Sequence, residues 1–301
     1  MLATIATILF ILLGVSLIFV LIRTVKGRPI ERRIVFIYIA LGVILPLFMT
    51  LTPPLPVTHD VQRLVDALDD LSPGSKVLAA FDYDPPSAPE LQPMAVAFMK
   101  YAFKRDLKVI IMGLWPQGPQ MANQAIADAL EDPEVAAKNL QYGIDYVNLG
   151  FQSGNEFVIQ SMGNTFKRMF PQDDHRTPYD SIPLVANVTN FSNIDFVFNL
   201  SSGKPGTVEW VQIAVDRFGA KMGAGNTAVQ APMVYPYLRS GQLHGLLGGM
   251  SGAAEFEKAV SETGKASTYL LSQMMAHATV IAFILIGNVA FFISRRLEKK
   301  Q

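Results

Sequence analysis

The amino-acid sequence predicts an α/β domain with a mostly parallel sheet flanked by helices, together with three transmembrane helices. Three observations predict this fold class. Long apolar stretches lie near both ends of the chain, basic residues cluster beside them, and the middle of the chain alternates short apolar runs with amphipathic stretches. Only 17% of the 301 residues are charged, whereas about 25% is typical of soluble domains. The composition therefore indicates an integral membrane protein.

The first apolar segment, residues 1–22, carries no charged residue. A helix of this length spans about 30 Å, which is the thickness of the hydrocarbon core of a bilayer. A cleaved signal peptide is the alternative, but it requires basic residues before the apolar stretch. Here the basic residues follow it, in the loop 23–33. We therefore predict that this segment is an uncleaved transmembrane helix.

Two further apolar segments, residues 34–52 and 269–294, predict the second and third transmembrane helices. Pro46 lies inside the second segment, and a proline kinks a helix because it has no N–H to donate. Neighbouring helices tolerate such a kink inside a membrane. The third segment ends at a basic tail, residues 295–301.

Three polar residues interrupt the third segment on one helical face. Gln273 and His277 are four positions apart, and Asn288 follows eleven positions after His277. Polar side chains within a membrane usually face other helices. Gln273, His277 and Asn288 are therefore candidate helix–helix contacts, either within the chain or with another subunit. The alternative places Gln273 and His277 at the level of the lipid headgroups.

The distribution of charge predicts the orientation of the chain. Nine of the 25 basic residues lie in the loop 23–33 and the tail 295–301, and such basic flanks stay in the cytoplasm. The N-terminus and the domain of residues 53–268 are then extracytoplasmic, and the C-terminus is cytoplasmic, in a cell (inner or plasma) membrane. That domain has 16 basic and 23 acidic residues, which argues against nucleic acid as a partner.

Five short apolar runs predict buried strands, at residues 76–81, 107–114, 146–151, 196–200 and 243–247. Helical patterns separate them. Such alternation implies a largely parallel sheet covered on both faces, which is Rossmann-like or like the sheet of solute-binding proteins. Ligands of these sheets bind beyond the carboxyl ends of the strands.

The residues that follow the strands are therefore the candidate ligand-binding residues. They are Asp82, Asp84, Trp115, Ser201, Ser202, Lys204, Asn226 and Thr227. The last two belong to a glycine-rich segment, 223–227, which we interpret as a flexible loop.

Each of these candidates has a structural alternative. Asp82 and Asp84 share one face if the first strand continues through them, and the two carboxylates could then bind a cation or act as acid and base. In the structural alternative they cap the next helix. The loop around Lys204 precedes a helix and suits an anion, or it simply leads into that helix. Trp115 either stacks on a ligand or covers the core.

No residue of the chain is assigned as catalytic or as a metal ligand, and no cofactor is predicted. The sequence has no cysteine, which excludes disulfides, thiol catalysis and thiolate metal sites. The nucleophile and zinc-binding motifs of common hydrolases are also missing. Asp173, Asp174 and His175 form one local acid–histidine cluster, but a solvated turn is the simpler interpretation.

Several strings of the domain resemble a family of prokaryotic membrane-anchored proteins with an extracytoplasmic α/β domain and no assigned function. They are FDYDP (81–85), PELQPM (89–94), GLWPQG (113–118), YPYLRSGQLHGLLGG (235–249) and GAAEFE (252–257). The passage YLRSGQLHGLLGG is also similar to a helix–Ser-Gly-Gln–strand passage of periplasmic solute-binding proteins. The resemblance implies no catalytic residues.

Three functions follow as hypotheses. The first is a non-enzymatic subunit of a larger membrane assembly, either a homo-oligomer or a complex with other membrane protein subunits. The second is a membrane-tethered ligand-binding or sensory domain for a small anionic ligand. The third is a carboxylate-dependent hydrolase or transferase that uses Asp82 and Asp84.

Overall fold

The computed structural model describes residues 2–26, 28, 31–49, 55–262 and 264–298. The chain divides into two compact units. One unit is helical and combines Met1–Pro54 with Ser267–Gln301, and the other is the α/β domain Leu55–Ala266.

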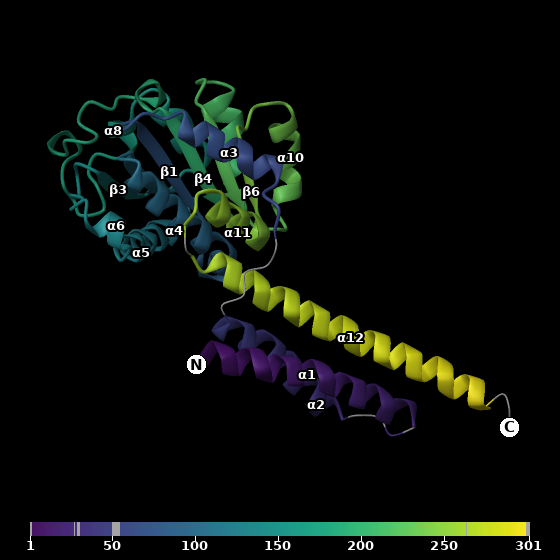
Figure 1. The fold of residues 1–301 in the computed structure, drawn as a ribbon. Helices are drawn as coiled ribbons and strands as arrows, with labels where there is room; N and C mark the ends of the chain where they lie inside the picture. Colours follow the sequence, from purple (N-terminus) through teal and green to yellow (C-terminus); the bar gives the residue numbers. More distant parts are fainter. Residues whose placement is uncertain (1, 27, 29–30, 50–54, 263, 299–301) are drawn as a thin grey trace. The chain divides into compact units, whose positions relative to one another are not determined.

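The α/β domain is built on one sheet of six parallel strands, in the order β3-β2-β1-β4-β5-β6. The strand order reverses beside β1, between β1 and β4, which makes this place the topological switch point of the sheet. Figure 1 shows the strands running side by side through the domain. The strands are β1 (Lys76–Asp82), β2 (Lys108–Gly113), β3 (Tyr146–Phe151), β4 (Phe196–Ser201), β5 (Met222–Asn226) and β6 (Leu246–Gly248).

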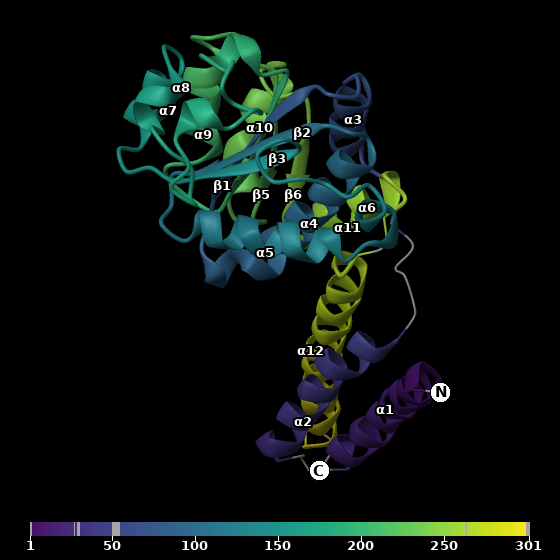
Figure 2. The same cartoon turned by 90° about the vertical axis from the view of Figure 1, so that its left-hand side faces the viewer.

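Helices cover both faces of the sheet, as Figure 2 shows. One face is covered by α3 (His59–Asp69), α4 (Ala88–Lys104), α5 (Gly118–Leu130) and α11 (Gly249–Ala259). The other face is covered by α7 (Glu156–Met162), α8 (Phe166–Met169), α9 (Thr207–Trp210) and α10 (Ala231–Arg239). Shorter helical segments are η2 (Pro85–Ser87), α6 (Pro133–Ala136), η3 (Tyr179–Ser181), η4 (Phe191–Asn193) and the π-helical η5 (Val211–Val215).

Packing on both faces explains why the strands are almost wholly apolar. Leu78 and Ala79 point to opposite faces of β1, and both are fully buried. On the α4 side, the rings of Phe98 and Phe198 stack with their centroids 4.3 Å apart. Burial of one such side chain stabilises the fold by about 1.5–3 kcal/mol. The predicted mostly parallel α/β sheet is thus confirmed.

The interpretation of residues 223–227 as a flexible loop is wrong, because Met222–Asn226 form the buried strand β5. The glycines allow neighbouring side chains to lie directly on the strand. A Cβ atom on Gly223 would lie 2.3 Å from Leu64 Cδ1, and one on Gly225 would lie 2.8 Å from Met94 Sδ. Larger residues would therefore push α3 and α4 away from the sheet.

Within the described residues, two helices are long and apolar enough to cross a membrane. They are α1 (Leu2–Val25) and α12 (Ala266–Glu298). The second predicted segment, residues 34–52, does not form one long helix. Its described part is the 13-residue α2 (Arg32–Ile44) followed by the 3-10 helix η1 (Leu45–Phe48), and residues 50–52 lie outside the described residues. Pro46 at the start of η1 accounts for the break, because it cannot continue the α-helical hydrogen bonding.

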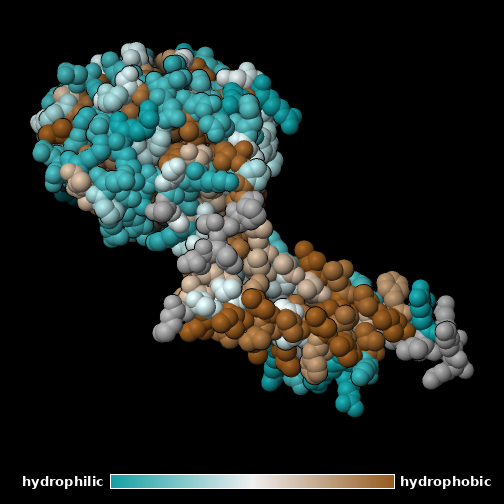
Figure 3. Space-filling view, viewed as in Figure 1, coloured by the Kyte–Doolittle hydropathy of each residue, from teal (hydrophilic) through white to brown (hydrophobic). Residues whose placement is uncertain are grey.

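Within the helical unit, α2 contacts both α1 and α12. Tyr38 Oη of α2 lies 2.7 Å from Ser16 Oγ of α1, and its ring meets the ring of Phe283 of α12 edge-on. Ser272 Oγ of α12 also donates to the carbonyl of Val43 at 2.7 Å. The outer surface of these helices is largely hydrophobic in Figure 3, whereas the visible surface of the α/β domain is largely hydrophilic.

Candidate functional site

Three of the candidate ligand-binding residues lie side by side at the carboxyl edge of the sheet. Asp82 ends β1, Ser201 ends β4 and Asn226 ends β5, and the strand register pairs Asp82 with Ser201 and Ser201 with Asn226. All three side chains are fully buried. The structure therefore brings them together at the switch point, in the interior of the domain.

Asp82 is the centre of this cluster. Its carboxylate accepts three hydrogen bonds, each 2.7 Å long, from Leu114 N–H, Asn199 Nδ2 and Trp210 Nε1. Burial raises the pKa of Asp82 to about 7, and the three donors oppose that rise. The carboxylate has no cationic partner in the described part of the chain, so hydrogen bonds alone compensate for its desolvation.

A chain of hydrogen bonds leads to Asp82 from the neighbouring strands. Asn226 Nδ2 donates to Thr207 Oγ1 at 2.9 Å, and Thr207 Oγ1 donates to Asn199 Oδ1 at 2.7 Å. Asn199 in turn donates to Asp82. Because each group donates in the same direction, the bonds strengthen one another. The cluster is a satisfied polar network, and its side chains are engaged with one another.

Two glycines allow the loop between β2 and α5 to close over the end of β1. A Cβ atom on Gly113 would lie 2.7 Å from the carbonyl oxygen of Phe81, and one on Gly118 would lie 1.9 Å from it. Only glycine permits so close an approach of one backbone to another. The closure places the N–H of Leu114 on Asp82.

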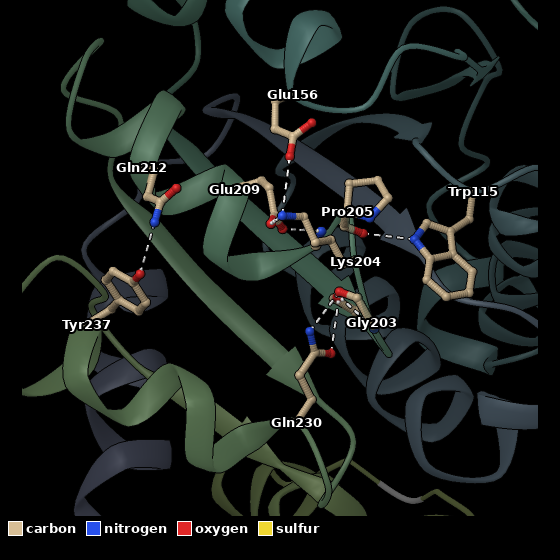
Figure 4. A network of polar contacts seen from close by, with 11 residues as sticks. Trp115, Glu156, Gly203, Lys204, Pro205, Glu209, Gln212, Gln230 and Tyr237 are labelled. Atoms are coloured by element: carbon tan, nitrogen blue, oxygen red, sulfur yellow. Dashed lines mark hydrogen bonds and ion pairs between the residues drawn. The ribbon is translucent and has the colours of Figure 1, made fainter.

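The lysine of the loop between β4 and α9 is already paired with acidic side chains of α9 and α7. Lys204 Nζ lies 3.3 Å from Glu209 Oε1 and 3.7 Å from Glu156 Oε1, as Figure 4 shows. The other oxygen of Glu209 accepts the N–H of Gly206 at 2.8 Å, and the bond with Glu209 raises the pKa of Lys204. The anion site proposed here stays a prediction, and a ligand would have to displace Glu209.

Trp115 packs against this same loop. Its Nε1 donates to the carbonyl of Pro205 at 2.8 Å (Figure 4), and its ring lies 3.0 Å from the position of a Cβ atom on Gly203. The neighbouring hydroxyl of Ser202 is buried and has no hydrogen-bond partner among the described residues. In this arrangement Trp115 covers the β4–α9 loop with its ring.

The remaining two candidates lie outside the network. The strand β1 ends at Asp82, so Asp84 lies in the following turn, where its carboxylate accepts the hydroxyl of Ser87 at 3.1 Å. Asp82 and Asp84 therefore do not form a pair of carboxylates on one strand face. Thr227 lies before α10, at the turn that leads into this helix, and its carbonyl accepts the N–H groups of Gln230 and Ala231.

Sequence reasoning missed the partners that complete the network. They are Asn199, Thr207, Glu209, Trp210 and Gln230. Asn199 gave a usable signal, because it is the one polar residue within the apolar run 196–200. A polar residue in a buried strand needs a partner. The others lie on α9 and before α10, and no local pattern connects them to β1.

The acid–histidine cluster forms a turn. Asp173 accepts the N–H of Thr177 at 2.7 Å and the hydroxyl of Tyr142 at 2.9 Å. The His175 ring stacks on Tyr142, with ring centroids 4.4 Å apart. Within the described ranges, no three His, Asp or Glu side chains are grouped as metal ligands.

The polar residues of α12 divide between two faces of that helix. Ser272 and Thr279 are buried, and Ser272 bonds to α2. Gln273, His277 and Asn288 are exposed, and none of them bonds to α1 or α2 in the described structure. Asn288 Nδ2 donates only within its own helix, to the carbonyl of Ile284 at 3.0 Å. Among the described residues, these three side chains therefore make no hydrogen bond to another helix.

Comparison with known proteins leaves the resemblance noted in the sequence as a prediction. No protein-family model matches the chain. The search of curated proteins also gives no match.

Proposed function

We propose that this protein is a non-enzymatic subunit of a homo-oligomeric membrane assembly and presents its α/β domain on the extracytoplasmic side. One observation carries the proposal. Gln273, His277 and Asn288 all lie on the face of α12 that α1 and α2 leave uncovered. The rest of that face is apolar, with Ile281 and Ile284 each 55% exposed.

A second copy of the chain is the partner that fits this face best. An unpaired amide in hydrocarbon is costly, by several kcal/mol on apolar transfer scales (about 4–8). Asn and Gln side chains both donate and accept. Two copies inserted in the same direction place Gln273 opposite Gln273 and Asn288 opposite Asn288, at equal depths. Each polar group then meets a complementary group of its own kind.

The α/β domain supports a non-enzymatic role. The carboxylate of Asp82 is fully buried and accepts three hydrogen bonds. Asp84 is engaged in a separate turn. A glycosidase-type hydrolase that used Asp82 and Asp84 would need both carboxyl groups to face a common substrate, and this geometry does not favour that alternative.

The proposed topology has three membrane crossings, the second made by α2 and η1 together. Thirteen α-helical residues and four 3-10 residues rise by about 28 Å in total, close to the ~30 Å of a hydrocarbon core. Exposed apolar side chains such as Phe36 and Phe48 suit contact with lipid. With this crossing, the basic loop 23–33 and the basic C-terminal segment lie on the same, cytoplasmic side.

Labelling of single cysteines tests this topology, because the chain contains no cysteine of its own. Both Lys26 and Glu131 are exposed. We expect Glu131→Cys to react with a membrane-impermeant maleimide in intact cells. Lys26→Cys should react only after the membrane is permeabilised. Reaction of both cysteines from the same side would show that α2 and η1 do not cross.

The mass of the gently solubilised protein tests the assembly. We expect native mass spectrometry to find a discrete multiple of the 33.0 kDa chain. The combined variant Gln273→Leu, His277→Leu and Asn288→Leu should shift the mass to that of the monomer, because it removes the three uncharged polar side chains from the uncovered face of α12.

Thr279→Val is the matched control for the assembly. Thr279 is also a polar residue of α12, but it is buried and bonds to the carbonyl of Met275 in its own helix. Its substitution should leave the mass unchanged. A wild-type protein that is monomeric in mild detergent would overturn the proposal, and so would an assembly that survives the combined variant.

A further inference from the structure

A pocket of about 510 Å³ lies at the β6 edge of the sheet, between α3 and α10. These two helices flank β6 in Figure 1. The volume is within the range of small-molecule sites, about 300–1,000 Å³. The pocket shares no residue with the polar network around Asp82. It is lined by His59, Asp60, Arg63, Tyr235, Leu238 and Arg239.

Arg63 is held in a defined position in this pocket. Its Nη1 donates to the carbonyl of Leu238 at 3.4 Å, and its Nη2 donates to the carbonyl of Leu243 at 3.2 Å. A guanidinium group has five N–H donors, so three remain for another partner. Because Arg63 is anchored to two backbone carbonyls, little side-chain entropy is lost when a ligand binds.

The other polar side chains of the pocket are free to bind a ligand. Within the described residues, the side chains of His59, Asp60, Tyr235 and Arg239 make no hydrogen bond or ion pair. Two guanidinium groups therefore face the pocket against one carboxylate, that of Asp60. This local excess of positive charge contrasts with the domain as a whole, where acidic residues outnumber basic ones by 23 to 16.

We infer that this pocket binds the phosphate group of a small organic molecule. Arginine presents a planar fork of donors that matches phosphate oxygens. Two arginines, a tyrosine hydroxyl and a histidine offer more donors than the two oxygens of a carboxylate can accept. A phosphate has three or four oxygens. The volume also leaves room for an organic group beside the phosphate.

Calorimetry of the full-length protein with glycerol 3-phosphate tests this site. We expect Arg239→Gln to weaken binding roughly tenfold or more, because a charge-assisted hydrogen bond is lost. Arg239 is exposed and makes no bond with the described chain, so the variant should fold normally. Arg63 is a poorer choice, because it also supports the end of α10.

Arg217→Gln is the matched control. Arg217 is exposed and lies outside the pocket, so its substitution removes the same charge without touching the site. The affinity of Arg217→Gln for glycerol 3-phosphate should stay within about twofold of the wild-type affinity, because the charge of Arg217 is distant from the pocket and screened by salt. Asp60→Asn should strengthen binding, because it removes the one negative charge from the pocket.

The phosphate group that the pocket binds could belong to a soluble compound or to a lipid headgroup, and binding to lipid bilayers distinguishes the two. Nanodiscs of phosphatidylglycerol and of phosphatidylcholine serve as the probes. Binding of glycerol 3-phosphate that depends on Arg239 assigns the pocket to soluble phosphate monoesters. An Arg239-dependent preference for phosphatidylglycerol without such binding assigns it to an anionic headgroup.

The inference is overturned if neither probe binds at millimolar concentration, or if Arg217→Gln weakens binding as much as Arg239→Gln. It does not depend on the proposed assembly, since none of these variants lies in the helical unit. Native mass spectrometry of Arg239→Gln should therefore show the wild-type mass.

Discussion

Replacing Asp82 with alanine is expected to lower the free energy of unfolding of the α/β domain by about 3–6 kcal/mol. The carboxylate accepts hydrogen bonds from Leu114, Asn199 and Trp210, and all of these groups are buried. Alanine leaves the three donors without an acceptor, at a cost of about 1–3 kcal/mol each. Since whole domains are stable by only about 5–15 kcal/mol, this loss is a large fraction of the total.

Tryptophan fluorescence during denaturant unfolding measures this effect. Both tryptophans of the chain, Trp115 and Trp210, belong to the α/β domain, so their emission reports on that unit in the full-length protein. Asp84→Ala is the matched control, because it removes a partly exposed carboxylate with one partner, Ser87. We expect the control to lose less than about 1 kcal/mol. If Asp82→Ala and Asp84→Ala lose the same free energy of unfolding, the buried network around Asp82 does not stabilise the domain more than an ordinary surface contact does.

Denaturant unfolding repeated at a series of pH values separates the effect of the charge of Asp82 on stability from the effect of its hydrogen bonds. The pKa of Asp82 is raised from 3.8 to about 7 by burial. The folded state therefore holds this proton more tightly than the unfolded state between these two values. The proton on Asp82 therefore stabilises the folded state. This contribution to the free energy of unfolding is fully present below about pH 4 and is lost as the pH rises through 7, by about 4 kcal/mol in total.

Asp82→Asn is the control for the charge, because it keeps the shape of the side chain but cannot ionise. The difference between the two proteins isolates Asp82 from other titrating groups. His244 is one such group, because burial lowers its pKa, and its contribution is therefore lost in the opposite direction, as the pH falls. A wild-type profile parallel to that of Asp82→Asn would contradict the raised pKa.

The class of the domain was predictable because buried parallel strands leave a simple signal. Runs such as Lys108–Gly113 are buried on both faces and alternate with helical patterns along the chain, which is typical of a parallel sheet. The strand β5 escaped prediction for a physical reason. Its glycines are required by side chains of α3 and α4 that pack on the strand backbone, and that requirement is invisible until those helices are placed.

The position of the candidate site in the sheet was predictable from the sequence, but the contacts of its side chains were not. The topology of a parallel sheet brings Asp82, Ser201 and Asn226 to one edge, and strand ends can be read from the sequence. Whether such residues face a cavity or one another depends on distant partners. Trp210, which closes the network over Asp82, is 128 positions away in the chain. Side-chain packing at that separation leaves no local pattern.

In the helical unit, the sequence predicts which residues share a face of a helix but not which face the other helices cover. A spacing of four and eleven positions predicts that Gln273, His277 and Asn288 share one side of α12, and all three are exposed there. The spacing cannot tell which side the other helices cover. That depends on contacts such as Ser272 with Val43, which follow from the three-dimensional packing of α2.

Replacing Gly118 with alanine is expected to lower the free energy of unfolding by about 3 kcal/mol or more. The new Cβ atom would lie 1.9 Å from the carbonyl oxygen of Phe81, which is a backbone atom in the middle of the sheet. The start of α5 must therefore move away from β1. That movement also pulls the N–H of Leu114 away from Asp82, so unfolding and the emission of Trp210 should both change.

Gly219→Ala separates this steric effect from the general effect of replacing a glycine. Gly219 has a φ of +69°, and no atom of the described residues lies within 4 Å of the position that a Cβ atom would take there. Alanine therefore costs only the left-handed conformation, about 1 kcal/mol. If the two variants lose the same stability, the close approach of α5 to β1 is not what fixes the loop. A clearly larger loss for Gly118→Ala means that closure of this loop and the three hydrogen bonds of Asp82 form one cooperative unit. In that case the combined variant with Asp82→Ala should lose less than the sum of the two single losses.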